Sequence, residues 1–111
     1  MSSSTAPVPG DAIVSILYPA TLPGTSTPNK FDLEYYVSKH IPLVKARGAA
    51  LGLKSIAVAT LDPSTGYAVE CVAVWENVEA FGALTKDEEI MGDVTNFSEV
   101  PPTARIGKVV G

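Results

Sequence analysis

Four segments of the chain carry the apolar pattern of β-strands. Each is rich in β-branched and aromatic residues, which pack well on a pleated surface, and turn-forming residues bound them. Asp62, Pro63 and Gly66 form a turn signal between the second and third segments, so these two are expected to pair as an antiparallel hairpin. In the last segment, Gly107 and Lys108 suit the edge of a sheet. The predicted strands cover residues 12–18, 54–60, 67–75 and 103–110.

Two stretches between these strands place apolar residues at helical spacing instead. The first is expected to begin at Asn29, a favourable N-cap, and to end at Gly52. Pro42 lies inside it and has no backbone donor, which predicts a kink just after His40. The second begins at the N-cap Asn77 and is followed by a short helical piece. The apolar positions are Leu33, Tyr36, Val37, Val44 and Leu51 in the first helix, Val78, Phe81 and Leu84 in the second, and Ile90 and Met91 in the short piece.

The order strand–helix–strand–strand–helix–strand is that of a ferredoxin-like α+β fold, βαββαβ. It predicts one four-stranded antiparallel sheet with two helices on one face. Both faces of the sheet are apolar, since Ile56 and Val58 alternate with Ala57 and Ala59 in the second strand. Two helices cover only one face. The open face therefore needs a partner, most simply a second copy of the chain that packs sheet on sheet as a homodimer.

The composition agrees with one folded domain. The 111 residues predict a single domain over residues 12–111, behind a flexible tail of residues 1–11. Apolar residues make up 46% and charged residues 18%, which excludes a disordered chain and favours a covered apolar face. The net charge of −4, without any basic run, argues against nucleic acid as a partner. No apolar run is long enough for a membrane span and no secretory signal is recognisable, so a cytoplasmic protein is expected.

His40 is the candidate for chemistry, because it falls in the middle of the apolar stripe of the first helix. An imidazole buried there needs a hydrogen-bond partner. It is either a structural histidine bonded to Tyr36 or to a backbone carbonyl, or a proton donor and acceptor in an apolar pocket, since histidine titrates near neutrality. In the second interpretation Tyr36 would donate a hydrogen bond to a substrate oxygen.

Further side chains are candidates for substrate binding. Glu70 interrupts an apolar strand and either pairs with a basic residue at an exposed or inter-subunit position or orients a substrate. Arg47 either reaches solvent at the helix edge or binds an anionic group. Cys71 is expected to be an inert core residue. Metal-ligand spacing and nucleotide-binding motifs are absent from the sequence, so no cofactor or metal is expected. The expected walls of a small apolar pocket are Tyr18, Val37, Val44, Trp75 and Phe81.

Five short segments have the spacing of a known family. They are Leu17-Tyr18-Pro19, Phe31-Asp32-x-x-Tyr35-Tyr36-x-x-x-His40-x-Pro42-Leu43-Val44, Gly52-Leu53, Val78-Glu79-Ala80-Phe81 and Asn96-Phe97-Ser98. Together they resemble the EthD family of the dimeric α+β barrel superfamily, from about residue 12 to 110. The resemblance implies a ferredoxin-like protomer that pairs through its sheet, with a cleft between helices and sheet. It places the family's histidine on His40 and its tyrosine pair on Tyr35 and Tyr36.

The superfamily includes cofactor-free oxygenases, polyketide cyclases, muconolactone-type isomerases and haem-degrading monooxygenases. Our first hypothesis is a cofactor-independent enzyme of catabolism or secondary metabolism that acts on a small apolar substrate, aromatic or lactone-type. His40 would serve as general acid or base in an isomerisation, cyclisation or decarboxylation. One alternative is an EthD-type oxidoreductase or monooxygenase without a tightly bound cofactor. Another is a non-catalytic accessory protein that binds a hydrophobic ligand, and a haem protein with His40 as axial ligand ranks last because haem needs more room.

Overall fold

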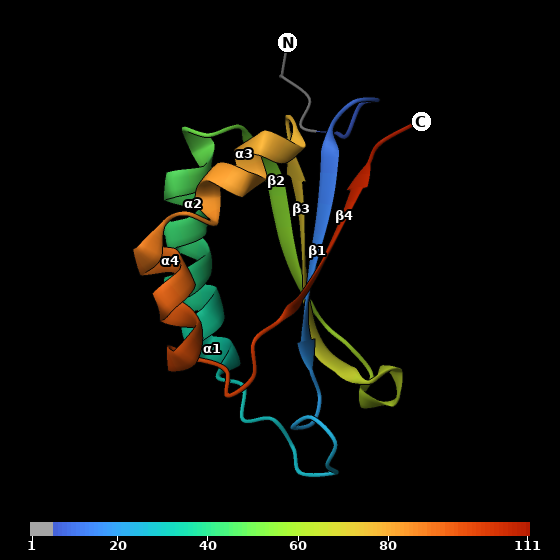
Figure 1. Cartoon of the computed structure of the whole chain (residues 1–111), viewed down its shortest axis with the longest axis vertical. Coiled ribbons are helices and arrows are strands. Elements are labelled where there is room, and N and C mark those ends of the chain that lie inside the picture. The colour runs from blue at the N-terminus through green and yellow to red at the C-terminus, as the bar shows by residue number, and fades with distance from the viewer. Residues whose placement is uncertain (1–5) are drawn as a thin grey trace.

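The sheet of the computed structural model, which describes residues 6–111, has four antiparallel strands in the order β2-β3-β1-β4 (Figure 1). Its two central strands, β3 and β1, pair along their whole length, and β2 and β4 form the edges. The strands are β1 (Ala12–Pro19), β2 (Leu53–Thr60), β3 (Tyr67–Trp75) and β4 (Thr103–Lys108). The predicted ferredoxin-like α+β fold with one four-stranded antiparallel sheet is therefore confirmed.

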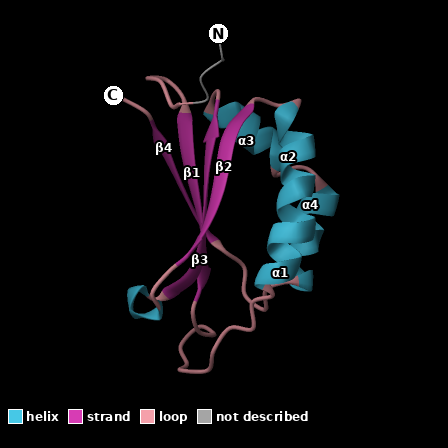
Figure 2. Cartoon of the chain, turned by 180° about the vertical axis from the view of Figure 1, so that it is seen from behind, coloured by secondary structure: helices cyan, strands magenta, loops and turns pink. Residues whose placement is uncertain are grey.

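The main helices form a second layer on one side of the sheet, and the opposite face of the sheet carries none of them (Figure 2). A long helical arm connects β1 to β2, and shorter helices connect β3 to β4. The arm consists of α1 (Leu33–Tyr35), the π-helical turn η1 (Tyr36–His40) and α2 (Ile41–Ala49). The second connection consists of α3 (Val78–Leu84), α4 (Glu88–Gly92) and the 3₁₀ turn η3 (Asp93–Asn96), and a further 3₁₀ turn, η2 (Pro63–Thr65), lies in the β2–β3 hairpin.

The strand register decides which side chains meet the helices. In β3, Val69, Cys71, Ala73 and Trp75 occupy alternate positions, are buried, and pack in the two core clusters with helical residues. The positions between them belong to the open face. Among these is Val72, which pairs with Ser15 of β1 and Ala57 of β2. The open face is thus apolar at its centre, as the sequence predicts.

The first helix begins three residues later than expected. The N-cap is Asp32, whose carboxylate accepts the backbone N–H of Tyr35 at 3.0 Å. Asn29 instead fastens the loop before the helix, because its amide donates to the Pro19 carbonyl at 3.0 Å and to the Ser98 hydroxyl at 3.2 Å. The expected N-cap is therefore wrong. The two acceptors of the Asn29 amide group lie outside the helix, one of them 69 residues away, and local patterning does not detect such bonds.

The buried residues of the first helix also differ from those that the sequence predicts. The buried residues of the arm are Tyr36, His40, Ile41, Val44 and Gly48, whereas Leu33, Val37 and Leu51 are exposed by 38%, 50% and 39%. The prediction assumed an uninterrupted 3.6-residue period. The π-turn inserts one residue into that period, so the side chains before His40 are rotated relative to those after it. Where a kink was expected, just after His40, the structure has a π-turn that ends at His40, and the helix continues through Pro42 as α2.

Hydrogen bonds and an ion pair fix the described residues that come just before β1. Asp11 accepts the Lys54 ammonium at 2.7 Å and the Val8 N–H at 3.0 Å, and its backbone pairs with Val109. The first five residues of the predicted tail lie outside the described residues. Within residues 6–111, no helix is both long and apolar enough to cross a membrane.

Candidate functional site

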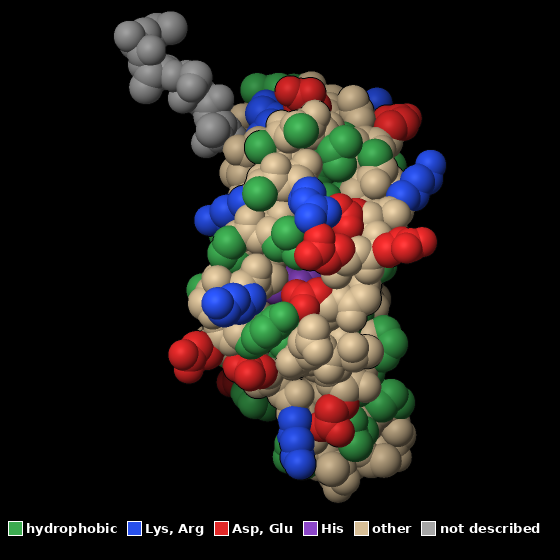
Figure 3. All heavy atoms as spheres, turned by 90° about the vertical axis from the view of Figure 1, so that its left-hand side faces the viewer, with side chains coloured by type: hydrophobic (Ala, Val, Ile, Leu, Met, Phe, Trp, Pro, Cys, Tyr) green, Lys and Arg blue, Asp and Glu red, His purple; other side chains and the backbone are tan. Residues whose placement is uncertain are grey.

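A cavity of about 340 Å³ lies between the helical layer and the sheet. Its size is at the lower end of the range for small-molecule sites, and its walls are almost entirely apolar. The sheet contributes one wall, the arm a second, and the α3–η3 connection a third. The outer surface of the helical layer carries interspersed acidic, basic and hydrophobic side chains, and the histidine colour shows there only as a small area (Figure 3). The principal lining residues are Val14, Ile16, Tyr18, Ile56, Cys71, Ala73, Trp75, Tyr36, His40, Ile41, Val44, Phe81, Leu84, Ile90, Met91 and Val94.

The π-turn brings His40 to this cavity. At its end, the backbone N–H of Ile41 donates to the carbonyl of Tyr36, five residues earlier, where an α-helix would use a residue four earlier. Pro42 follows within the first two positions of α2 and has no N–H, so the regular ladder is already incomplete here. The wider turn places both Tyr36 and His40 on the buried face. His40 is 6% exposed.

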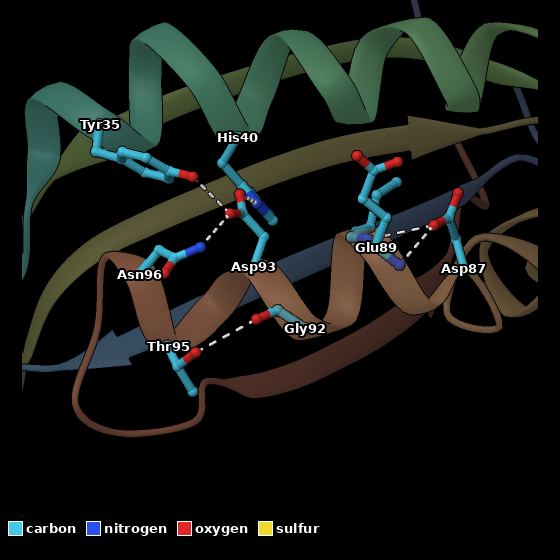
Figure 4. A network of polar contacts seen from close by, with 9 residues as sticks. Tyr35, His40, Asp87, Glu89, Gly92, Asp93, Thr95 and Asn96 are labelled. Carbon is cyan, nitrogen blue, oxygen red and sulfur yellow. Dashed lines mark hydrogen bonds and ion pairs between the residues drawn. The ribbon is translucent and has the colours of Figure 1, made fainter.

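Asp93 is the partner of His40, across from the arm on η3. Its Oδ2 lies 2.9 Å from Nδ1 of the imidazole. Its Oδ1 accepts two hydrogen bonds, one from the Tyr35 hydroxyl at 2.6 Å and one from the Asn96 amide at 2.8 Å. Figure 4 shows this carboxylate pointing from its turn towards the arm, where the side chains of Tyr35 and His40 converge on it.

The electrostatics of the network favour an ionised carboxylate. Burial opposes ionisation of Asp93, but hydrogen bonds from Tyr35, Asn96 and His40 outweigh it and keep the pKa of the carboxyl below its ordinary value. The same contact acts on Tyr35, whose hydroxyl donates to Asp93 and whose pKa is raised for that reason. At neutral pH the group beside His40 is therefore an anion that only accepts hydrogen bonds.

The second ring nitrogen of His40, Nε2, has no hydrogen-bond partner among residues 6–111. Among the described residues, Nε1 of Trp75 is the one fully buried side-chain nitrogen or oxygen without a partner. Nε2 of His40 is therefore not fully buried and keeps some accessible surface. Since His40 lines the cavity and Nδ1 is directed at Asp93, Nε2 is the ring nitrogen left to interact with a molecule in the cavity. An apolar cavity with one accessible basic nitrogen can accept a proton from a bound molecule.

Aromatic rings hold the imidazole plane. Tyr36 stacks on His40 with ring centroids 5.4 Å apart and an interplanar angle of 16°, and the Phe97 ring packs against the imidazole with centroids 4.6 Å apart. The Tyr36 hydroxyl interacts with Tyr18 and Cys71 on the sheet. The hydrogen bond expected between Tyr36 and His40 is thus replaced by ring stacking, and Asp93 supplies the polar partner.

Burial controls the acid–base state of the groups on the sheet side. It raises the pKa of the Tyr18 and Tyr36 hydroxyls well above the ordinary tyrosine value, so both stay protonated. Burial also raises the pKa of the Cys71 thiol to about 11, in agreement with an unreactive core cysteine. On the same wall, Nε1 of Trp75 is a buried donor without a partner in the described residues. Of the groups that line the cavity, His40 is therefore the one with an unpaired basic nitrogen that can accept a proton.

The structure brings most of the residues predicted to bind substrate to the cavity and leaves three outside. Val37 is half exposed and lies on the outer groove between the arm and β2. Arg47 forms ion pairs with Asp87 and Glu89 at the start of α4. Glu70 pairs in register with Leu17 and Ala59 and belongs to the open face. The candidates that line the cavity are Tyr18, Tyr36, His40, Val44, Trp75 and Phe81.

The sequence interpretation missed Asp93. A weak signal was present, because Ile90, Val94 and Phe97 follow helical spacing and Asp93 lies three residues after Ile90 on the same side. An acidic residue on a buried helical face indicates that a basic or hydrogen-bonding side chain lies close to it. The partner itself is 53 residues earlier, so only the tertiary fold identifies it. In the described part of the chain, no cluster of histidine, cysteine, aspartate or glutamate side chains could hold a metal ion.

Among solved structures, the chain is similar to EthD-like proteins. An EthD-like protein from Ralstonia eutropha JMP134 superposes with a TM-score of 0.72 and 27% identity, over 94% of this chain and 96% of that one. The resemblance to the EthD family is thereby confirmed. No model of a protein family matches the sequence, and no curated protein matches it.

Two more distant structures share the fold. A dimeric ferredoxin-like protein from an uncultured marine organism is 12% identical, with a TM-score of 0.52 over 94% of this chain and 90% of that one. SnoaB from Streptomyces nogalater, a cofactor-independent oxygenase crystallised as a single-residue variant, is 14% identical, with a TM-score of 0.50 over 91% of each chain. At these identities the likeness shows the common fold.

Proposed function

We propose that this chain, which resembles a solved EthD-like protein, is a cofactor-independent enzyme that removes a proton from a small apolar substrate. The observation that carries the proposal is the accessible Nε2 of His40 in an otherwise apolar cavity. A general base of this kind contributes about 10²–10⁴-fold to a rate. The substrate is a neutral ring compound with one acidic proton, such as a phenol, an enol or an enolisable lactone or ketone.

The charge balance of the step supports a neutral substrate. When Nε2 takes the proton, the imidazole becomes a cation beside the Asp93 carboxylate, and the substrate becomes an enolate or phenolate anion. The new cation is then paired on one side by Asp93 and on the other by the substrate anion, in surroundings where an unpaired charge is costly. A substrate that arrives already ionised would meet the Asp93 carboxylate without a compensating cation.

Two reactions can follow the same proton transfer. If the proton returns to a different carbon, the substrate is isomerised. If the carbanion combines with dioxygen, it forms a hydroperoxide, and the substrate itself is the reductant. The fold shared with SnoaB supports the second branch. Isomerisation by the first branch stays a prediction, and so do cyclisation and decarboxylation, which would require further bond changes after or instead of the proton return.

Proton abstraction can be measured without knowledge of the natural substrate. β-Tetralone is a neutral two-ring ketone with acidic C–H bonds, and their exchange with deuterium in D₂O is followed by proton NMR. We expect the protein to accelerate this exchange and the substitution His40→Ala to lower the acceleration by about 10²–10⁴-fold. Oxygen uptake in the same mixture separates oxygenation from isomerisation.

The matched control is Arg47→Met, which removes a charge on the same arm but outside the cavity. It should leave the exchange rate unchanged. Bound β-tetralone without accelerated exchange in the unmodified protein would contradict the enzyme proposal, and would favour a non-catalytic protein that binds hydrophobic ligands.

The open face of the sheet supports a second part of the proposal, a homodimer. Its centre is apolar and has no helix over it (Figure 2). The dimeric ferredoxin-like protein with the same fold supports a second copy as the partner. Glu70 then lies at the interface between the two sheets.

A further inference from the structure

We propose that Asp93 is a positioning residue that holds neutral His40 in the tautomer with its proton on Nδ1, so that Nε2 presents a lone pair to the cavity. This inference rests on the proposed function, because it explains how the proposed base is kept ready. It also concerns a property of the free protein that can be measured directly. The contact that carries it is the 2.9 Å distance between Asp93 Oδ2 and His40 Nδ1.

The two oxygens of Asp93 have separate partners, and this division fixes the role of each. Oδ1 accepts from the Tyr35 hydroxyl at 2.6 Å and from the Asn96 amide at 2.8 Å. Oδ2 is left to His40. Since an ionised carboxylate has no proton to donate, Nδ1 must supply the proton of the bond to Oδ2. A neutral imidazole has one N–H, so Nε2 is then an acceptor.

The network comes from two elements that are far apart in the sequence. Tyr35 and His40 belong to the arm, and Asp93 and Asn96 belong to η3 (Figure 4). Asn96 lies one turn after Asp93 and ties the carboxylate to its own turn. The side chain of Asp93 is 12% exposed and that of His40 is 7% exposed, so little water competes for the bond between them.

The substitution Asp93→Asn gives a sharp test, because the network predicts which way the new amide will lie. The asparagine oxygen will take the place of Oδ1, since Tyr35 and Asn96 both donate there. The NH₂ group will then face Nδ1 of His40 and donate to it. We expect the tautomer to invert, with the proton on Nε2 and no lone pair towards the cavity.

The chain contains a single histidine, so the tautomer can be assigned without ambiguity. The protein is labelled with ¹⁵N-histidine. The ¹⁵N chemical shifts of the two ring nitrogens are measured at a pH at which the imidazole is neutral, and they show which nitrogen carries the proton. The unmodified protein should show a protonated Nδ1 and an unprotonated Nε2, and Asp93→Asn should show the reverse. The control Tyr35→Phe removes one donor to Asp93 and keeps the carboxylate, so it should retain the original tautomer.

The inference is overturned if neutral His40 in the unmodified protein carries its proton on Nε2, a result that needs no variant to fold. It is also overturned if folded Asp93→Asn keeps the proton on Nδ1.

The exchange assay distinguishes this failure from that of the proposed function. If the tautomers behave as expected but His40→Ala exchanges β-tetralone normally, only the enzyme proposal fails. If exchange needs His40 but Asp93→Asn changes neither tautomer nor rate, only the positioning role fails.

Discussion

A buried imidazole is stable only when its polar atoms find partners, and His40 meets this condition at one nitrogen. Asp93 accepts from Nδ1, while Nε2 has no hydrogen-bond partner among residues 6–111. A purely structural histidine would be expected to use both nitrogens. At the scale of the residue, the unsatisfied nitrogen separates the functional interpretation of His40 from the structural one.

The lowered pKa of Asp93 leads to a prediction about stability and pH. The folded-state pKa lies below the ordinary value of 3.8, so the carboxylate stabilises the fold above that value and loses its contribution as the pH falls through the folded-state pKa. At neutral pH we expect Asp93→Asn to be less stable than the unmodified protein. The difference should shrink in acid, where both proteins carry a neutral side chain at this position.

Urea unfolding followed by circular dichroism at neutral and acid pH measures this difference. The exposed Glu34 has no side-chain hydrogen bond, so Glu34→Gln is the matched control and should show little effect at either pH. A stability deficit of Asp93→Asn that is as large in acid as at neutral pH would show that ionisation of Asp93 makes no contribution.

At the scale of the element, the interrupted arm is what makes the site. A continuous α-helix would place Val37 near Val44 on the buried face, whereas the π-turn leaves Val37 half exposed and directs Tyr36 and His40 inward. The arm also packs closely on the sheet after the turn. A Cβ added at Gly48 would lie 3.0 Å from Cβ and Cδ2 of Leu53 and 3.1 Å from Cη2 of Trp75.

Two glycines in helices should therefore respond in opposite directions to alanine. Gly48→Ala gains helix propensity but forces a methyl group against the strand residue Leu53 and the buried Trp75, and overpacking of this kind costs about 1–3 kcal/mol. We expect a net loss of stability. Gly82 lies in α3 with no atom within 4 Å of an added Cβ, so Gly82→Ala should gain roughly 0.5–1 kcal/mol. Thermal unfolding of both variants checks the pair, and a stabilised Gly48→Ala would refute the close approach.

At the scale of the whole molecule, one layer of helices on a two-sided apolar sheet leaves an unfinished surface. Ile13 and Val72 are partly exposed on adjacent strands of this face, and Val74, which faces Ile13 in register, is buried. A soluble protein rarely leaves such a surface in water. The same layer arrangement creates the cavity on the helical side, so the two faces of one sheet serve the proposed dimer and the proposed site separately.

The dimer can be tested at the centre of this face. Val72→Lys places a charge where a second sheet would pack, and it should convert a dimer to a monomer in sedimentation velocity at micromolar concentration. Val37→Lys is the control, because it adds the same charge on the exposed part of the arm and should leave the dimer intact. A stable monomer of the unmodified protein under these conditions would rule out the homodimer.

From the sequence by itself follow the element order, the antiparallel sheet, the two-sided strands and the choice of His40, because periodicity and turn residues act over a few positions. The use of Asn29 in the loop instead of as N-cap, the phase of the arm, and the separation of Val37, Arg47 and Glu70 from the cavity were decided by tertiary structure. So was the pairing of His40 with Asp93, which lies 53 residues away. The physical reason is the same in each case. Hydrogen bonds and packing between distant segments outweigh the small local preferences that a sequence pattern reports.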